Sequence, residues 1–232
     1  MINQQSLAST ANTLNYGRIY EYRFRGVDHT KKQIVWKEIS HWLYAGYLNK
    51  PNSILDPAGG LCEFINLVPA NEKWTIDIEK DFIEKYANPD VQLIVGNNLQ
   101  VALPQNHFDA VFISNFLEHL HSQEEVATLL TRMHTSMKSG GRIAIMGPNF
   151  KYTYKEYFDF ADHTVILSEL GLAEHLYGAG FNIVKIIPRF LPLSFRSGGV
   201  LPVTPFTVKA YLSLPLAWKV MGKQFLVIAE KK

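Results

Sequence analysis

The sequence predicts an α/β fold, a doubly wound and mostly parallel sheet with helices on both faces. Short apolar runs, typical of buried strands, alternate along the chain with segments of helical spacing. One early run ends in the turn Asp56–Gly60, and a glycine turn between a strand and a helix is typical of such sheets. The composition, with 47% hydrophobic and 19% charged residues, is that of a globular protein.

Two segments precede the first predicted strand. We expect residues 1–15 to form a frayed tail, because they are polar and lack a clear period. Residues 16–27 alternate aromatic rings with arginines, which predicts either a connector packed on the core or a lid over a substrate. Helical spacing of apolar residues from 31 to 48 predicts a helix that covers one face of the sheet, and the polar stretch 49–52 ends it.

Seven apolar runs are predicted to be strands. They lie at residues 54–55, 73–76, 91–95, 108–114, 142–146, 182–187 and 225–229. Helices are expected between them at 61–68, 79–87 and 168–177. A further helix should begin at the capping-box pattern of Ser122 to Glu125 and end at Lys138 to Gly141, with a cation in its last turn and glycine beyond it.

Residues 188–222 do not fit an ordinary connector, because five prolines alternate there with aromatic and leucine residues. A loop of about 35 residues is long, and loops of this length tend to be functional. Three interpretations stay open: a packed irregular excursion or a subunit contact, as in a homodimer; a cover for a substrate; or a surface that rests peripherally against lipid, with basic residues toward the headgroups.

Length and charge limit the class of protein. We expect a single domain in 1–232, with its core in 50–187 and 223–232 and an N-terminal tail or lid in 1–30. A formal net charge of +2 argues against a nucleic-acid partner. The sequence has no run of about 18 apolar residues that would span a membrane.

The only cysteine, Cys62, excludes an intramolecular disulfide and argues against a zinc cluster. The N-terminus is polar and lacks an apolar signal core. We therefore expect a cytoplasmic protein without a bound metal.

The turn after the first strand carries the strongest indication of a ligand. Gly59 and Gly60 let the backbone approach a flat or bulky group, and Pro57 fixes one φ angle. A carboxylate at Asp56 would repel a pyrophosphate but attract an ammonium or sulfonium group. The turn therefore suits a cationic nucleoside better than NAD.

With these features in place, residues 50–147 resemble the class I S-adenosylmethionine-dependent methyltransferases. The glycine turn of that family corresponds to Asp56 followed by Ala58 to Cys62, in which Gly60 is the only glycine kept of Gly-x-Gly-x-Gly. Asp77, before Ile78, matches the acidic residue that closes strand two and accepts both ribose hydroxyls.

Three further motifs extend the resemblance. Asn97 and Asn98 lie where the family commonly places an Asp beside adenine N6, Asn115 to Leu120 resembles its segment after strand four, and Lys138 to Ile143 resembles its turn before strand five. The last predicted strand resembles the family's antiparallel one. The resemblance implies S-adenosylmethionine as cofactor, S-adenosylhomocysteine as product, and a cofactor site of Asp56, Ala58, Gly59, Gly60, Asp77, Ile78, Asn97, Asn98 and Asn115.

Methyl transfer from a sulfonium is an in-line displacement, so positioning supplies much of the acceleration. A hydroxyl acceptor also requires a general base, and the candidates are His119 and His163, unless they serve as capping or packing residues. Asp162 either orients an imidazole or faces solvent. The aromatic residues from Tyr152 to Phe158 either line a sugar or aromatic pocket or pack elsewhere.

We predict an S-adenosylmethionine-dependent methyltransferase that acts on a small molecule, with a hydroxyl or amine of a sugar or lipid-linked metabolite as the leading acceptor. One alternative is a catalytically degenerate binding module or scaffold, because the glycine pattern is eroded at Ala58 and Cys62. An NAD-dependent oxidoreductase or epimerase is disfavoured by Asp56 and by the lack of a Tyr-x-x-x-Lys pair after strand five.

Overall fold

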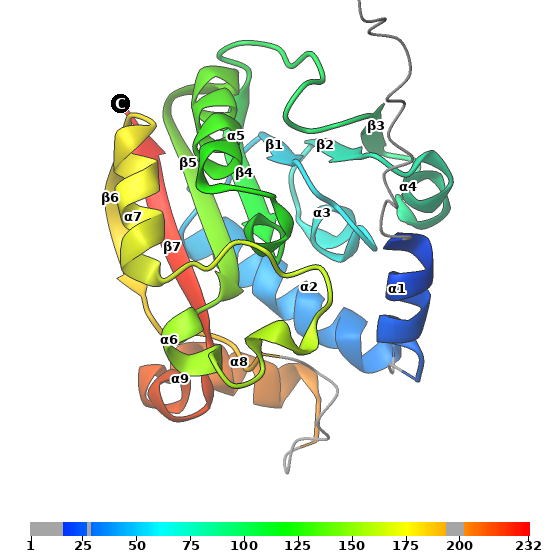
Figure 1. The fold of residues 1–232 in the computed structure, drawn as a ribbon, viewed down its shortest axis with the longest axis vertical. Helices are drawn as coiled ribbons and strands as arrows, with labels where there is room; N and C mark the ends of the chain where they lie inside the picture. Colours follow the sequence, from blue (N-terminus) through cyan, green and yellow to red (C-terminus); the bar gives the residue numbers. More distant parts are fainter. Residues whose placement is uncertain (1–15, 27–28, 194–201) are drawn as a thin grey trace, which may run out of the picture.

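The computed structural model describes residues 16–26, 29–193 and 202–232, and at its centre lies one seven-stranded sheet in the order β3-β2-β1-β4-β5-β7-β6 (Figure 1). The strands are β1 (Ser53–Asp56), β2 (Glu72–Asp77), β3 (Val91–Val95), β4 (Phe108–Ser114), β5 (Met137–Pro148), β6 (Phe181–Ile187) and β7 (Gln224–Lys231). Strands β1 to β5 pair in parallel, and β7 runs antiparallel to both β5 and β6. The predicted α/β sheet with an antiparallel last strand is confirmed.

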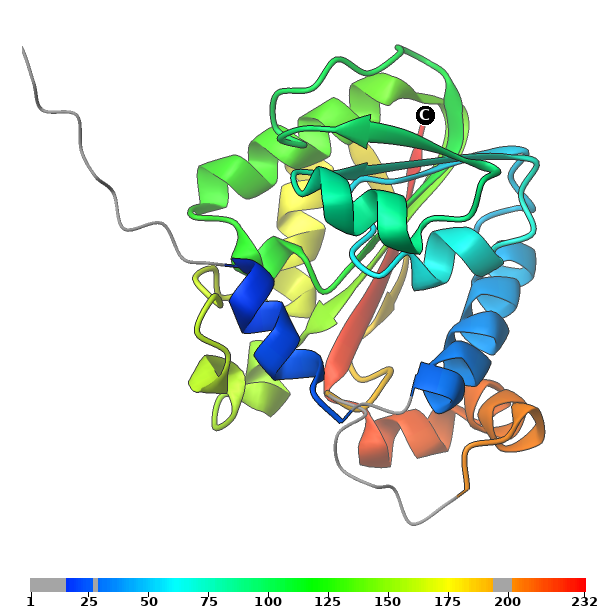
Figure 2. The same cartoon turned by 90° about the vertical axis from the view of Figure 1, so that its right-hand side faces the viewer.

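Helices cover both faces of this sheet (Figures 1 and 2). One face carries α2 (His29–Gly46), α3 (Glu63–Leu67) and α4 (Lys80–Tyr86), whose apolar residues share a buried cluster with β1 and β4. The other carries α5 (Gln123–Ser136) and α7 (Glu169–Gly178) in a second cluster. Strands buried on both faces explain the continuous apolar runs in the sequence.

The helix predicted from Ser122 ends earlier than expected. Its start is as predicted, because the Ser122 hydroxyl accepts a hydrogen bond from the Glu125 N–H at 3.2 Å. However, α5 stops at Ser136, and Met137 already pairs with Phe108 of β4. Lys138 and Gly141 therefore lie in β5, in the stretch between the paired residues Met137 and Arg142 where the register with β4 shifts.

One of the three interpretations of 188–222 was a packed irregular excursion, and irregularity is wrong for residues 202–222. Residues 202–222 contain α8 (Pro205–Ser213) and α9 (Pro215–Met221), each of which starts at a proline that has no N–H to leave unpaired. The excursion is nevertheless packed: Trp42 of α2 stacks on Phe190 with a centroid distance of 5.2 Å and meets Trp218 edge-on at 5.7 Å. Residues 194–201 lie outside the described part of the chain.

The N-terminal segment with alternating rings and arginines is a helix, α1 (Tyr16–Phe24), while the predicted tail 1–15 falls outside the described residues. Short helical turns follow β4 and β5: η1 (Leu117–His119), α6 (Phe150–Thr153) and η2 (Tyr157–Asp159). Within the described ranges, no helix combines the length and apolar character needed to cross a membrane.

Candidate active site

A cavity of about 450 Å³ opens at the carboxyl ends of β1, β2 and β4. Strands β1 and β4 are neighbours, and the chain continues from β1 to β2 on one side and from β4 to β5 on the other. The strand order therefore reverses between β1 and β4, and ligands of open α/β sheets bind at such a switch point. Every residue predicted to bind cofactor or to act in catalysis lines this cavity: Asp56, Ala58, Gly59, Gly60, Asp77, Ile78, Asn97, Asn98, Asn115, His119 and His163.

The glycine turn forms one wall of the cavity, and its two glycines serve different purposes. A Cβ on Gly59 would lie 2.2 Å from Thr75 Oγ1, so only glycine lets the turn press against β2. A Cβ on Gly60 would meet nothing within 4 Å, but its φ of +52° is in the left-handed region that favours glycine. The turn therefore presents bare backbone to the cavity.

Cys62 occupies the third glycine position of the family motif without entering the cavity. Its φ of 56° is left-handed, which explains why glycine is usual there. The side chain is fully buried, with Sγ 3.7 Å from the Gly60 carbonyl oxygen, and it is not among the cavity-lining residues. Burial, aided by Asp56 and Asp77, raises the pKa of the thiol to about 12, so Cys62 is not a nucleophile.

Two carboxylates face the cavity from the ends of β1 and β2. Asp56 is 4% exposed and accepts the Ala58 N–H at 3.1 Å, while Asp77 accepts the Glu79 N–H at 2.9 Å. Burial raises the pKa of Asp56 to about 7 and also raises that of Asp77. Among the residues that the structure describes, neither forms an ion pair. The pair suits a ligand that brings a positive charge and hydroxyl donors, which S-adenosylmethionine has.

The two asparagines predicted to contact adenine are partly engaged by the protein. Asn97 Oδ1 accepts the Leu99 N–H at 2.8 Å, and Asn98 Nδ2 donates to the Pro57 carbonyl at 3.1 Å. Asn98 therefore ties the loop after β3 to the glycine turn.

The acceptor side of the cavity is built around His119 at the end of η1. Its Nδ1 lies 3.1 Å from the carbonyl oxygen and 3.2 Å from the carboxylate of Asp162. Asp162 is buried and also accepts a hydrogen bond from Arg23 of α1, whose guanidinium lies 5.2 Å from the Phe160 ring centroid. Since Nδ1 has these partners, Nε2 is the nitrogen that His119 leaves available.

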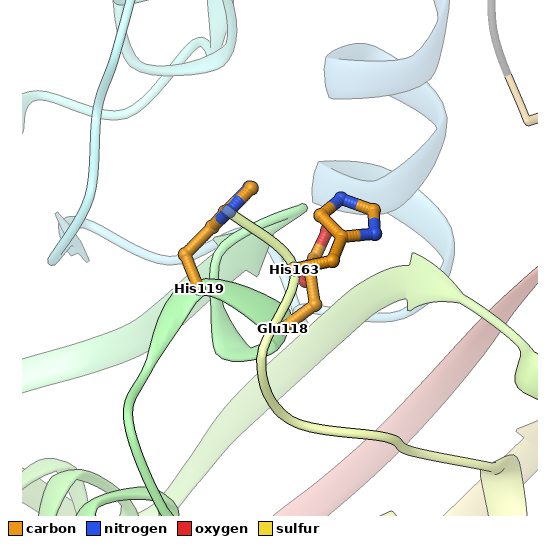
Figure 3. Close-up of side chains that lie close together, drawn as sticks. All are labelled: Glu118, His119 and His163. Atoms are coloured by element: carbon orange, nitrogen blue, oxygen red, sulfur yellow. The ribbon is translucent and has the colours of Figure 1, made fainter. Parts of the chain in front are cut away.

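His163 lies beside His119, with a ring-centroid distance of 4.9 Å, and stacks on Phe160 at 4.7 Å. Burial and the nearby His119 lower the pKa of His163 to about 4, so it is neutral near pH 7. Glu118 completes the group: it is 3% exposed, and burial raises its pKa. Figure 3 shows the side chains of Glu118, His119 and His163 gathered close together. One ligand-type atom from each lies within 4.8 Å of those of the other two.

The predicted aromatic pocket is not present in this cavity. Tyr152, Tyr154 and Phe158 are exposed, and Tyr157 is buried with its hydroxyl donating to the Val165 carbonyl. None of these four lines the cavity. Tyr157 packs edge-on against Phe150 and Phe158, and the Arg189 guanidinium lies over the Tyr152 ring.

Sequence reasoning assigned no role to several cavity residues. Glu118 was part of a recognised motif but was not predicted to act, and Asp162 was left between two interpretations. Trp36 and Gln224 come from α2 and β7, far apart in sequence, and no local pattern marks them. Arg23 supports the lid interpretation of residues 16–27, because it lines the cavity.

The chain is similar to known methyltransferases in part of its sequence and in its fold. Residues 55–145 match the family model of a methyltransferase domain. No curated protein matches the sequence. Among solved structures, a methyltransferase dependent on S-adenosylmethionine from Archaeoglobus fulgidus is 22% identical, with a TM-score of 0.65, over 94% of this chain and 100% of that one.

Two further solved structures share the fold. An S-adenosylmethionine-dependent methyltransferase from Thermotoga maritima is 14% identical, with a TM-score of 0.63, over 94% of this chain and 96% of that one. A geranyl diphosphate C-methyltransferase from Streptomyces coelicolor, solved with S-adenosyl-L-homocysteine, is 13% identical, with a TM-score of 0.55, over 78% of this chain and 71% of that one.

The fold is Rossmann-like, and the cavity lies at its switch point. The match over residues 55–145 and the shared fold agree with the resemblance to class I S-adenosylmethionine-dependent methyltransferases stated above.

Proposed function

We propose that this protein transfers a methyl group from S-adenosylmethionine to a hydroxyl or amine of a small molecule, with a sugar or lipid-linked metabolite as the leading class of acceptor. One observation carries the proposal: the nucleoside-side residues Asp56, Gly60 and Asp77 and the two histidines share a single cavity. That cavity thus holds a cationic cofactor site and a candidate base together.

Each wall of the cavity has a proposed role. Asp77 accepts the ribose hydroxyls, Gly59 and Gly60 leave room for the amino-acid part, and Asp56 compensates positive charge there. S-adenosylmethionine supplies a methyl group on a positively charged sulfur. The walls hold it and exclude water, and positioning of this kind accelerates an in-line displacement.

His119 is the proposed general base for a hydroxyl acceptor. Asp162 orients its imidazole through Nδ1, which leaves Nε2 to accept the acceptor's proton. Three buried polar atoms on cavity residues lack a partner among the described residues, namely Trp36 Nε1, His163 Nδ1 and Gln224 Oε1. Buried hydrogen-bonding atoms without a partner favour a polar methyl acceptor, because each atom would gain a hydrogen bond from that substrate.

The cofactor assignment is tested by calorimetric titration with S-adenosylmethionine and S-adenosylhomocysteine, with NAD as a negative control. Asp77→Ala should weaken S-adenosylmethionine binding by about 1.5–3 kcal/mol, the range for a hydrogen bond to a charged group. Asp81→Ala, an exposed aspartate on α4, is the matched control and should bind normally. Equal affinities of the two variants would remove Asp77 from the site.

The base assignment is tested on an acceptor found by screening hydroxyl and amine metabolites. His119→Ala should leave cofactor affinity unchanged and slow turnover by about 10²–10⁴-fold, the usual contribution of a positioned acid or base. Full turnover in that variant would contradict the assignment. Binding of cofactor without turnover on any methyl acceptor would instead favour the degenerate binding module. The Cys62 side chain gives that alternative no support, because it lies outside the cavity and does not narrow it.

A lipid-linked acceptor is favoured by the outer surface of α8 and α9. Phe206, Leu216 and Val220 are 79%, 75% and 76% exposed, and Lys209 and Lys219 lie on the same two helices. Apolar side chains flanked by lysines suit an anionic membrane surface. The full chain should sediment with phosphatidylserine vesicles more than with phosphatidylcholine vesicles, and less after Phe206→Ser with Leu216→Ser. Equal recovery with both vesicle types would remove this argument.

A further inference from the structure

We infer that Glu118, His119 and His163 bind one divalent transition-metal ion at the acceptor side of the cavity. Each residue offers a ligand atom, and these atoms lie within 4.8 Å of one another (Figure 3). One carboxylate and two imidazoles form a ligand set that suits Zn²⁺, Mn²⁺, Fe²⁺ or Co²⁺. The role of this ion in methyl transfer rests on the function proposed above; the binding site itself does not.

The side chains are held in place as metal ligands usually are. A ligating histidine commonly uses one ring nitrogen for the metal while a carboxylate or carbonyl fixes the other. His119 has this arrangement, because its Nδ1 is hydrogen-bonded to the Asp162 carbonyl oxygen at 3.1 Å, with the Asp162 carboxylate 3.2 Å away. Arg23 in turn holds Asp162. Asp162 is therefore a positioning residue. Its ion pair with Arg23 also compensates the guanidinium charge beside the proposed metal site.

Glu118 and His163 have no ion-pair partner in the part of the chain that the structure describes. His163 is 9% exposed, and its Nδ1 is buried without a hydrogen-bond partner among the described residues. Glu118 is 3% exposed and forms no ion pair within the described ranges. A buried carboxylate beside unpartnered imidazole nitrogen is costly to keep. A cation between them would interact favourably with the Glu118 carboxylate and with the His163 nitrogen at once. A packing or capping role does not explain why that nitrogen has no partner.

The geometry requires only a small adjustment. Ligand atoms on one metal lie about 3–4 Å apart for bonds of about 2.1 Å, so the three side chains need to close by about 1–2 Å. All three line the cavity, so the remaining coordination positions face the space where the acceptor binds. Three protein ligands with an open position are the pattern of catalytic rather than structural metal sites.

A metal ion at this position would activate the hydroxyl of the methyl acceptor without a general base. The hydroxyl oxygen binds the ion, which lowers the pKa of that hydroxyl, and its proton leaves to water. An oxygen lone pair then forms the new C–O bond, while the C–S bond breaks and its electron pair stays on sulfur, giving neutral S-adenosylhomocysteine. With the ion bound, His119 is a ligand instead of the base.

The experiment uses the full chain, treated with chelator and dialysed. Titration with CoCl₂, followed by calorimetry and by visible absorption, should show one ion per chain and the d–d bands of Co²⁺ with nitrogen ligands. His119→Gln and His163→Gln should each weaken Co²⁺ binding about tenfold or more, and Glu118→Gln likewise. His41→Gln, an exposed histidine on α2, is the matched control and should bind as the unmodified chain does.

Titration of the same samples with S-adenosylmethionine separates this inference from the proposed function. Retained S-adenosylmethionine binding shows that each variant is folded. Absence of stoichiometric Co²⁺ binding, or equal Co²⁺ affinity in the His119, His163 and His41 variants, overturns the metal site and leaves the methyltransferase proposal intact. Co²⁺ binding by a chain that fails to bind S-adenosylmethionine supports the metal site and removes the proposed function.

Discussion

Asp56 and Asp77 show how a few residues set the character of this cavity. Each lies at the end of a buried strand, and each accepts a backbone N–H from the turn that follows. These hydrogen bonds favour the charged forms, but burial outweighs them and raises both pKa values. The protein therefore keeps two carboxylates at a cost in stability, as functional sites often do.

The raised pKa of Asp56 predicts how cofactor affinity depends on pH. A cationic ligand stabilises the charged carboxylate and lowers its pKa in the complex, so binding is strongest above the free pKa of about 7. Below pH 7 the affinity for S-adenosylmethionine should fall by about tenfold per pH unit at most, and binding should release protons. Calorimetry at pH 6, 7 and 8 in buffers of different ionisation enthalpy measures both effects.

Asp56→Asn is the control for this prediction. It cannot ionise, so its affinity should be lower at pH 8 and should lose most of the dependence on pH. Other ionisable groups at the cavity would still change protonation with pH in this variant. A steep pH dependence that survives Asp56→Asn would assign the effect to those groups and contradict the role of Asp56.

The turn between β1 and α3 shows how an element tolerates an eroded motif. Only one of the family's three glycines is kept, yet the turn still presents bare backbone to the cavity, because Ala58 adds a single methyl group and Cys62 points into the core. The additional glycine, Gly59, is the one that sterics require, since it lies against Thr75 of β2. The turn thus exposes backbone at the cavity although its sequence departs from the motif that it resembles.

Gly59→Ala should therefore be destabilising. The new Cβ would lie 2.2 Å from Thr75 Oγ1, and forcing such a contact into a packed core costs about 1–3 kcal/mol of unfolding free energy. Gly46→Ala at the end of α2 is the control, because its Cβ would meet nothing within 4 Å. Urea denaturation of both variants measures the difference, and equal midpoints would contradict the close approach.

At the scale of the whole molecule, the excursion after β6 is part of the core. Phe190 and Trp218 pack on Trp42 of α2, and the Trp218 Nε1–H donates to the Tyr211 carbonyl at 2.7 Å, which links α9 to α8. The same helix α2 contributes Trp36 to the cavity. Helix α2 therefore contacts both the excursion, through Trp42, and the cavity, through Trp36.

Trp218→Ala should lower the unfolding free energy by about 3–5 kcal/mol, the usual cost of removing a buried aromatic ring. Val220→Ala, two residues along α9, removes a side chain that is 76% exposed and should change it by about 0.5 kcal/mol or less. Thermal or urea unfolding compares the two. Similar small effects would mean that α8 and α9 are attached to the core only loosely.

Much of the fold could be predicted because its signals are local. Strands β3 and β4 begin and end at the predicted residues, since each is a short apolar run bounded by polar turns. The end of the helix was predicted too late: α5 ends at Ser136, and Met137 already pairs with Phe108 of the distant strand β4. The prolines at 205 and 215 suggested irregular chain, but each starts a helix.

The candidate site divides in the same way. The sequence by itself determined the residues at strand ends, such as Asp56 and Asp77, because the carboxyl ends of parallel strands always meet at one edge. Only the tertiary structure decided that Arg23 holds Asp162, that Asp162 holds His119, and that Glu118 and His163 lie beside them. These residues are separated by up to 139 positions, and no local pattern encodes a contact formed by folding over such a distance.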